Sequence, residues 1–524
     1  MKNIKLSIYA LGILLLSSCN DFLDTMPDNR AEVNTTEKIT NLLVSAYPTH
    51  SNSYLMEFSS DNVMDNGTSY SSNTSQEEAY KWEPITTESN DDPKSLWEAY
   101  YVSIASANEA LSAISKLGNP DNLKAQKAEA LLCRAFSMFQ LANTFCMPYQ
   151  STESNKKNLG LPYPTEPETQ LDATYERGNV QELFDKINAD IEAALPNVDD
   201  NIYSVPKYHF NRSAAYAFAA KFNLYYMNYD KAIKYADEVL GSNPSNVLRD
   251  YRQYVALAGP DDICNAYVKA TEPANLLLVP AYSLVGRAFR SSSSFKRYNH
   301  SREITTNETF WAKGPWGSGS SNNILYTSTM LYGTNQCVYF PRQVEFWEYT
   351  DKTGGTGYPH IVSVAFSTDA TLLVRAEANA LKNNLEASIT DLNHWQTSHS
   401  KASAGKATRT TLTQESINTF MAGLAYAADT IYTAKDRSIK KHLHPQGFTV
   451  TAGNQENVIQ MILQCRRIET VFTGERWYDI KRYGIYVTHN LDATQPLILQ
   501  PGDLRYAIQL PASVISAGLP ANPR

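Results

Sequence analysis

The apolar positions that follow Trp97 recur at intervals of three and four residues. They mark one face of an amphipathic helix, formed by Trp97, Tyr100, Tyr101, Ile104, Leu111 and Ile114. The sequence Gly118-Asn119-Pro120-Asp121 ends this helix and begins another. The second helix carries apolar residues on one face from Leu131 to Phe145. The pattern therefore predicts that the two helices pack as an antiparallel hairpin.

Two more helical hairpins are predicted further along the chain. One runs from Ala214 to Leu240 and turns at Asn228-Tyr229-Asp230, and the other runs from Leu372 to Trp395 and turns at Lys382-Asn383-Asn384. Such units resemble tetratricopeptide hairpins, although they do not follow one another at the usual period of about 34 residues. We therefore expect a mainly α fold of degenerate tetratricopeptide-like hairpins, with long irregular loop insertions and little β structure.

The longest insertion covers residues 276–356 approximately and shows little helical periodicity. It is rich in Gly, Ser and Asn and also in Tyr, Trp, Phe and Arg. Long loops inside a compact chain are uncommon and usually functional, so we interpret this segment as a ligand-binding excursion. No long charged or Pro/Gly/Ser-rich linker interrupts the chain, so residues 35–524 are expected to form a single domain.

The N-terminus has the features of a bacterial lipoprotein signal. Lys2 and Lys5 precede an apolar run from Leu6 to Leu16, which is followed by Ser17, Ser18 and Cys19. The run is shorter than the roughly 20 apolar residues of a transmembrane helix. We expect residues 1–18 to be a signal peptide, Cys19 to be lipidated, and residues 19–34 to form a tether between the membrane and the folded domain.

Composition narrows the possible functions. The chain has 46 basic and 54 acidic residues, a formal charge of -8, and no basic stripe, which argues against nucleic-acid binding. The 33 Tyr, 18 Phe and 7 Trp residues are numerous, and Tyr and Trp suit wet recognition surfaces. The five cysteines after Cys19 are scattered and show no CxxC spacing, so neither a disulfide framework nor a structural zinc site is expected.

Several strings, taken in order, resemble the SusD/RagB family of outer-membrane lipoproteins from Bacteroidetes. Residues 19–24, Cys-Asn-Asp-Phe-Leu-Asp, resemble its mature start, and Trp97-Glu-Ala-Tyr-Tyr101 and residues 129–149 resemble its first two long helices. Residues 466–483, which contain Phe-Thr-Gly-Glu-Arg-Trp-Tyr-Asp, are close to its most specific string. The resemblance leaves mainly residues 245–365 uncovered. Two departures, a missing glycine before Pro148 and Gln509 in place of a common proline, affect connecting segments.

The resemblance implies a role in nutrient uptake. Proteins of this family are not enzymes and use no cofactor; they cap a SusC-like TonB-dependent transporter and capture nutrient, usually a glycan, for import. It also implies an outer-membrane, lipid-anchored protein that faces the extracellular side. The charged residues of the specific string are interpreted as a network of ion pairs that holds the closing helix: Arg466, Arg467, Glu469, Glu475, Arg476, Asp479 and Arg482.

A glycan site needs exposed aromatic rings beside side chains that form paired hydrogen bonds. Residues 66–82 and the excursion both supply this mixture. The candidate ligand-binding residues are Tyr70, Trp82, Arg290, Tyr298, Trp311, Trp316, Asn323 and Tyr326. Trp316 is the strongest of them, because it is flanked by Gly, Pro and Ser with few local apolar neighbours, and it is therefore expected to be exposed.

Two other functions stay open. Capture of peptides or glycopeptides would use the Arg287, Arg290, Arg297 and Arg302 series to bind carboxylates. A surface glycosidase would need a carboxylate pair, such as Asp61 and Asp65 or Asp91 and Asp92, about 5 to 9 Å apart across a cleft.

No catalytic residue is assigned from the sequence. Ser60-Asp-Asn, Ser293-Ser-Phe-Lys and Lys352-Thr-Gly are elements of penicillin-binding enzymes, but they occur here in the wrong order. His442 and His444 lack a third metal ligand at helical spacing, so no metal site is predicted either.

Overall fold

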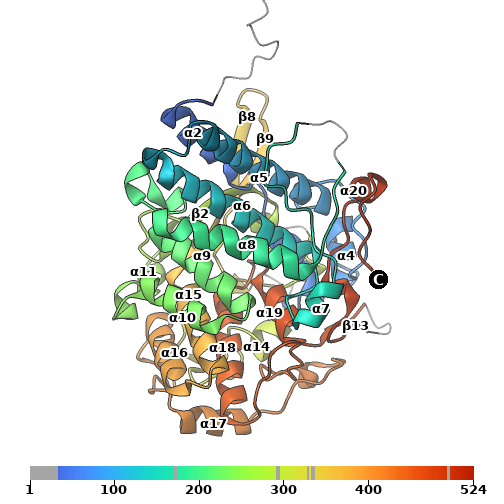
Figure 1. Ribbon diagram of the computed structural model, residues 1–524. Helices are drawn as coiled ribbons and strands as arrows, with labels where there is room; N and C mark the ends of the chain where they lie inside the picture. Colours follow the sequence, from blue (N-terminus) through green and yellow to red (C-terminus); the bar gives the residue numbers. More distant parts are fainter. Residues whose placement is uncertain (1–32, 170–173, 291–294, 327–329, 332–336, 492–495) are drawn as a thin grey trace, which may run out of the picture.

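A computed structural model describes residues 33–169, 174–290, 295–326, 330–331, 337–491 and 496–524. Helices dominate it and strands are few and short (Figure 1), which confirms the mainly α fold. Within these ranges no helix is long and apolar enough to cross a membrane. The signal peptide, Cys19 and almost all of the expected tether lie outside the described residues.

The three predicted hairpins are confirmed. They consist of α5 (Pro93–Lys116) with α6 (Lys124–Phe145), α9 (Arg212–Tyr225) with α10 (Tyr229–Leu240), and α15 (Thr368–Leu381) with α16 (Leu385–His399). The turns have the residues that tight helix connections need: Gly118 and Asn383 adopt positive φ angles of 81° and 63°, and the Asn228 side chain caps α10.

The hairpins stack into one helical layer. The long helix α8 (Val180–Ala194) packs against α6, and α10 packs against α15 (Figure 1). Alanines fill the inner face of α9, which allows its neighbours to approach closely, and an aromatic cluster that includes Phe136, Phe139, Phe218 and Phe222 closes the centre of the layer. This layer is the rigid body from which the remaining segments extend.

The closing helix contains the predicted ion-pair network. In α19 (Glu475–Tyr483), Arg476 binds both carboxylate oxygens of Asp61 at 2.8 and 2.9 Å, and in α18 (Asn454–Glu469) Arg466 binds Asp479 at 2.8 Å. Burial alone opposes ionisation of Asp61, but the guanidinium groups of Arg467 and Arg476 hold its pKa below the ordinary value. Removal of one partner would leave a buried charge uncompensated, so loss of any one of these residues should destabilise the fold.

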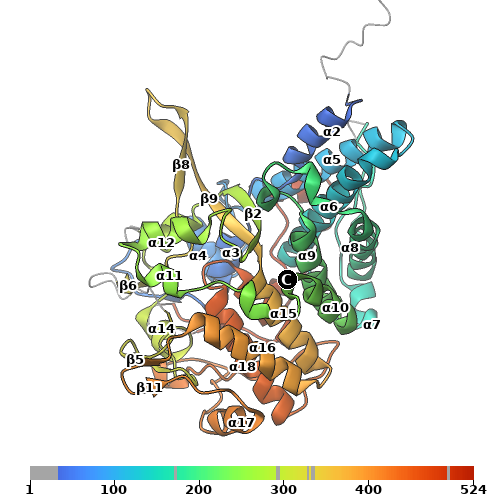
Figure 2. The same cartoon turned by 90° about the vertical axis from the view of Figure 1, so that its left-hand side faces the viewer.

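The excursion contains more regular structure than its sequence predicts. Strands β2 (Asn275–Tyr282), β9 (Thr356–Ser367) and β8 (Phe346–Asp351) form an antiparallel sheet in the order β2-β9-β8. The far ends of β8 and β9 project from the body as a two-stranded arm (Figure 2). Strand β9 includes the run Tyr-Pro-His-Ile-Val-Ser-Val-Ala-Phe, whose β-branched and aromatic residues favour an extended strand.

Smaller elements surround this sheet and the helical layer. The helices are α2 (Thr36–Leu43), α3 (Ser53–Ser59), α4 (Thr74–Tyr80), α7 (Thr152–Lys157), α11 (Arg252–Val255), α12 (Pro260–Tyr267), α13 (Val285–Ala288), α14 (Arg302–Asn307), α17 (Gln414–Ala422) and α20 (Ala512–Ser516). The short strands are β1 (Met64–Asp65), β3 (Tyr298–Asn299), β4 (Gly317–Ser318), β5 (Asn322–Asn323), β6 (Met330–Leu331), β7 (Val338–Tyr339), β10 (Ser403–Ala404), β11 (Ala407–Thr408), β12 (Val487–His489) and β13 (Leu497–Leu499).

Candidate ligand-binding site

Trp316 is buried, so the exposure expected from its sequence neighbours is wrong. Its side chain is 1% exposed and packs against Trp395 of α16, with ring centroids 5.8 Å apart. The backbone folds tightly around it through hydrogen bonds between Gly314 and Gly317 in both directions. A Cβ at Gly314 would lie 2.3 Å from the Trp316 ring. The glycines therefore allow the chain to close over the ring instead of leaving it in solvent.

Three further candidates are also buried. Trp82 stacks on His489 with centroids 4.4 Å apart and donates its Nε1 proton to the Ser59 carbonyl oxygen. Tyr298 stacks on Tyr80, and Asn323 donates to the carbonyl oxygen of Phe310. Their rings and amide groups are committed to the core. These side chains cannot meet a ligand at the surface without a change in the fold.

The other four candidates keep part of their surface accessible. Tyr70, Arg290, Trp311 and Tyr326 are half-buried. No contact among the described residues joins any two of these four side chains. Tyr326 lines a separate hollow. The sequence candidates thus do not form one site.

Most residues suggested for the alternative functions have partners within the chain, whereas Arg302 is exposed. Arg287 pairs with Glu345, Arg290 with Asp261, and Arg297 with Asp65. Asp61 lies in the buried network described above, and Asp91 accepts hydrogen bonds from Ser283 and Leu284. These contacts give each group a structural role.

The most exposed cluster of large aromatic residues lies on the arm, which we call the aromatic arm (residues 346–360). Trp347, Tyr349 and Tyr358 are 40%, 53% and 52% exposed. Trp347 and Tyr349 alternate along β8 and so share one face, with ring centroids 6.5 Å apart. Gly357 lies opposite Tyr349 in β9, and a Cβ there would be 2.9 Å from Trp347 Nε1. The Trp347 ring therefore lies over a bare stretch of backbone.

The opposite face of the arm continues the aromatic surface to the body. Tyr358 is paired with Glu348 across the strands and packs edge-to-face against Tyr282, with centroids 5.8 Å apart. The Tyr282 hydroxyl donates to Glu348 at 3.3 Å, and its ring contacts His50. The arm thus carries aromatic rings on both faces, beside carboxylate and hydroxyl groups that can form hydrogen bonds.

Asp91 attaches the base of the arm to the helical layer. This buried carboxylate lies two residues before α5 and accepts hydrogen bonds from the Ser283 hydroxyl and from the Leu284 backbone N–H, just after β2. Burial raises its pKa to about 7, although these hydrogen bonds oppose the shift. The position of the sheet relative to α5 therefore depends on a carboxylate that is costly to ionise.

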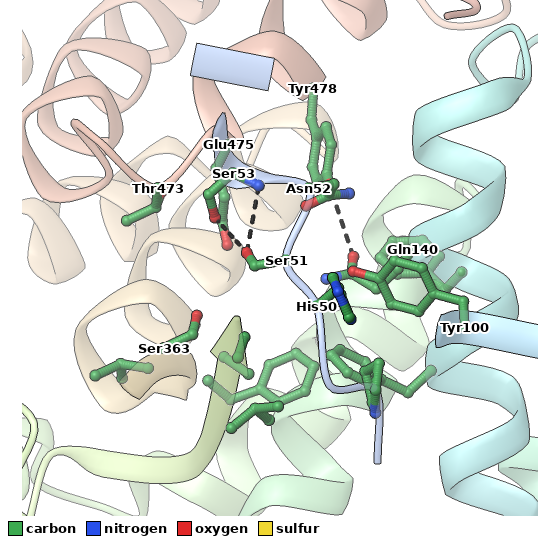
Figure 3. A pocket seen from close by; sticks show the side chains of 18 of the residues that line it. His50, Ser51, Asn52, Ser53, Tyr100, Gln140, Ser363, Thr473, Glu475 and Tyr478 are labelled. Carbon is green, nitrogen blue, oxygen red and sulfur yellow. Dashed lines mark hydrogen bonds between the residues drawn. The ribbon is translucent and has the colours of Figure 1, made fainter. Parts of the chain in front are cut away.

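A small cleft with a mixed polar and apolar lining lies under the same sheet (Figure 3). It is lined by His50, Ser51, Ser363 of β9 and Tyr478, and Lys221 and Glu475 form an ion pair of 2.6 Å at its wall. Its volume of about 50 Å³ suits a few water molecules. The cleft is too small for a sugar ring, so it is secondary to the arm as a candidate surface.

Comparisons with known proteins agree with this architecture. The family described as "Starch-binding associating with outer membrane" has a model that matches residues 21–224. No curated protein matches the sequence. Among solved structures, a SusD superfamily protein from Bacteroides thetaiotaomicron VPI-5482 is 19% identical, with a TM-score of 0.60, and the match covers 93% of this chain and 98% of that one.

Two proteins from Bacteroides vulgatus ATCC 8482 are similar to the same extent. A putative sugar binding protein is 16% identical, with coverage of 94% and 99% and a TM-score of 0.61. A SusD-like carbohydrate binding protein is 15% identical, with coverage of 92% and 96% and a TM-score of 0.56. At these identities the structures show a shared fold. Residues 21–224 match the family model and the chain shares its overall fold with SusD superfamily structures, which agrees with the resemblance seen in the sequence.

Proposed function

We propose that this protein is a carbohydrate-binding lipoprotein of the outer membrane that captures glycan with its aromatic arm. The observation that carries the proposal is the exposure of Trp347, Tyr349 and Tyr358 on one projecting element. Exposed aromatic rings are costly to leave in water and are typical of recognition surfaces. The relatives described as sugar-binding or carbohydrate-binding, and the starch-binding description of the matching family, support the choice of ligand.

The chemistry of the arm suits a sugar chain. The flat C–H faces of a sugar ring pack against aromatic rings, and the hydroxyl groups at its edge need donors and acceptors nearby. Trp347 and Tyr349 supply the rings on one face, while Glu348 and the Arg287–Glu345 pair supply polar groups close to the arm. A two-stranded arm is open on all sides, so it can bind the middle of a long polymer as well as its end.

The arm lies where a membrane-anchored capture protein needs it. The arm and α2 extend toward the same end of the molecule in both views (Figures 1 and 2). A lipid on Cys19 would be separated from α2 by a tether that spans at most about 60 Å when fully extended. A SusC-like TonB-dependent transporter in the same membrane is the proposed recipient of the glycan. We place the protein on the extracellular side of that membrane.

Binding by paired variants tests the proposal. The chain without its signal and with Cys19→Ser would be screened against a panel of polysaccharides and peptides, and the best ligand would be measured by titration calorimetry. The double variant Trp347→Ala/Tyr349→Ala should weaken glycan binding by about tenfold or more. Tyr432→Ala is the matched control, because Tyr432 is 69% exposed on the segment after α17 and should not contribute.

Other outcomes of the screen would favour a different function. Binding of peptides alone would favour peptide capture, and release of shortened glycan after incubation would favour a glycosidase. Glycan binding that survives the double variant unchanged would leave the ligand class in place and remove the arm as its site.

A further inference from the structure

A second hollow, which we call the Tyr326 pocket, has a volume of about 440 Å³. This volume is in the range of pockets that hold small ligands. Four separate segments form it: the stretch from Ser245 to Arg252, Tyr326, the C-terminal end of α16, and the β10–β11 region with Arg409. The pocket shares no lining residue with the aromatic arm.

Arginines outnumber acidic residues in the wall of this pocket. Arg249, Arg252 and Arg409 line it, whereas Asp250 is the only acidic residue among the described lining residues. Lys401 stands next to the pocket, with its Nζ 5.9 Å from the centre of the Tyr326 ring. This basic surface contrasts with a chain whose formal charge is -8. Asp250 offsets Arg252, and Asp369 and Glu272 lie beside Arg249. Arg409 and Lys401 form no ion pair among the described residues, so they are the positive charges that favour an anionic ligand.

The arginines keep donors available after their internal contacts are made. Arg409 Nη1 donates to the carbonyl oxygens of Thr397 and Ser400 at 3.1 and 2.9 Å, which satisfies the C-terminal end of α16 and fixes the guanidinium group. Its Nε and Nη2 have no partner among the described residues. Arg252 uses Nε and Nη2 to bind Asp250, and its Nη1 has no hydrogen-bond partner among the described residues.

Arg249 adds a fixed positive charge at the base of the pocket. Its side chain is fully buried and donates to the Tyr254 hydroxyl and to Asn275. Asp369 lies 3.8 Å from its Nε and offsets its charge from beneath. Arg249 thus holds its position without a ligand, while Arg252 and Arg409 have the donors that a ligand can reach.

We propose that the Tyr326 pocket binds an acidic sugar residue, whose carboxylate or sulfate group accepts hydrogen bonds from Arg409 and Arg252 while its ring packs on Tyr326. Arginine suits this role because its planar fork of N–H donors matches the oxygens of both groups. The inference rests on the proposed glycan-binding function and deepens it by naming a substrate class. A polymer with acidic units would then be held at two places, by ring stacking on the arm and by charge in the pocket.

Matched oligosaccharides test this inference. Calorimetry on the mature chain would compare an oligogalacturonate, a sulfated oligosaccharide and a neutral oligosaccharide of equal length, each at two salt concentrations. Arg252→Gln and Arg409→Gln should each weaken binding of the acidic ligand by about tenfold and leave neutral binding unchanged. Whichever acidic ligand is affected identifies the anionic group. Arg212→Gln, which removes an exposed arginine that pairs with Glu238, is the control.

The variants separate this inference from the proposed function. Arg409 also binds the end of α16, so a second variant, Arg409→Lys, retains the positive charge there. It should recover less than half of the lost affinity, because lysine lacks the planar fork of N–H donors. Equal affinity for acidic and neutral ligands, or full retention of acidic binding in Arg252→Gln and Arg409→Gln, would overturn the pocket while glycan binding by the arm stands. A wild-type chain that binds none of the glycans would instead contradict the proposed function.

Discussion

Two tryptophans of the same excursion, Trp316 and Trp347, have opposite environments. Trp316 is 1% exposed and Trp347 is 40% exposed. Their sequence neighbours suggest the reverse, because Trp316 is surrounded by Gly, Pro and Ser whereas Trp347 lies between Phe346 and Glu348, close to Tyr349. What decides the difference is the tertiary partner: Trp395 of α16 packs against Trp316, while β8 is an edge strand with β9 on one side only. Exposure of an aromatic residue in a loop is therefore set by distant elements.

Substitution of Trp316 should produce the largest effect of this comparison. Trp316→Ala removes a fully buried indole and should lower the free energy of unfolding by about 3 to 5 kcal/mol. Trp347→Ala, on the open arm, should lower it by less than about 1 kcal/mol. Urea unfolding followed by circular dichroism measures both. Similar losses for the two variants would contradict the assignment of one residue to the core and the other to the surface.

The pH dependence of stability should show the link between the arm and the body. Because burial raises the pKa of Asp91 from its usual 3.8 to about 7, the folded state binds more protons than the unfolded state between these values. The contribution of Asp91 to stability should then fall as pH rises through this window, by up to about 4 kcal/mol, and remain lower above it.

The Asp91→Asn variant isolates this contribution. Burial also raises the pKa of Glu57 to about 7 and that of Asp369 to about 6, and it lowers the pKa values of His300 and His489 to about 4. The total pH dependence therefore includes other residues. Unfolding curves of wild type and Asp91→Asn between pH 4 and pH 7 should differ in slope, with the flatter dependence in the variant. Parallel slopes would mean that Asp91 ionises freely in the folded protein.

A glycine in the arm offers a smaller and more local perturbation. In Gly357→Ala the new methyl group would lie 2.1 Å from the Glu348 carbonyl oxygen and 2.9 Å from Trp347 Nε1, so the strand and the ring must shift. Glycan affinity should fall by about threefold or more, with little change in the unfolding midpoint. Gly259→Ala is a control, because a Cβ there meets nothing within 4 Å. Unchanged glycan affinity in Gly357→Ala would argue that the Trp347 face does not bind.

The smallest effect is expected at the base of the arm. Tyr282→Phe keeps the ring contact with Tyr358 and removes the hydroxyl that donates to Glu348. Since that hydrogen bond is long and partly exposed, its loss should cost about 0.5 kcal/mol or less in unfolding free energy. Glycan affinity that falls as far as in Trp347→Ala/Tyr349→Ala would show instead that the hydroxyl binds the ligand.

The helical part of the fold could be predicted because its signals are local. Apolar spacing defined α5, α6, α9, α10, α15 and α16, and residues such as Asn228 and Gly118 marked the turns between them. The charges of the closing helix were also interpreted correctly as an ion-pair network, since so many arginines and acids in one string need partners. Their most distant partner, Asp61, lies about 400 positions away and could not be inferred from the sequence.

The candidate site was harder to predict because it depends on contacts between distant segments. The excursion is rich in aromatic residues, but Trp316 and Tyr298 within it are buried, as is Trp82, and the arm residues were not among the candidates. A signal for the arm existed: Trp347 and Tyr349 alternate before Gly354 and Gly355, and Tyr358 follows, as in a β-hairpin. The pairing of β9 with both β2 and β8 had no comparable local signal.

Tryptophan fluorescence tests the central claim most directly. The best glycan of the panel would be titrated into the wild type, Trp347→Phe and Trp316→Phe, with emission recorded at each step. The account predicts a ligand-induced change in emission that disappears in Trp347→Phe and persists in Trp316→Phe. A sugar on the arm contacts the Trp347 ring and not the buried Trp316 ring. A change that persists in Trp347→Phe and disappears in Trp316→Phe would contradict it and move the site back to the loop around Trp316.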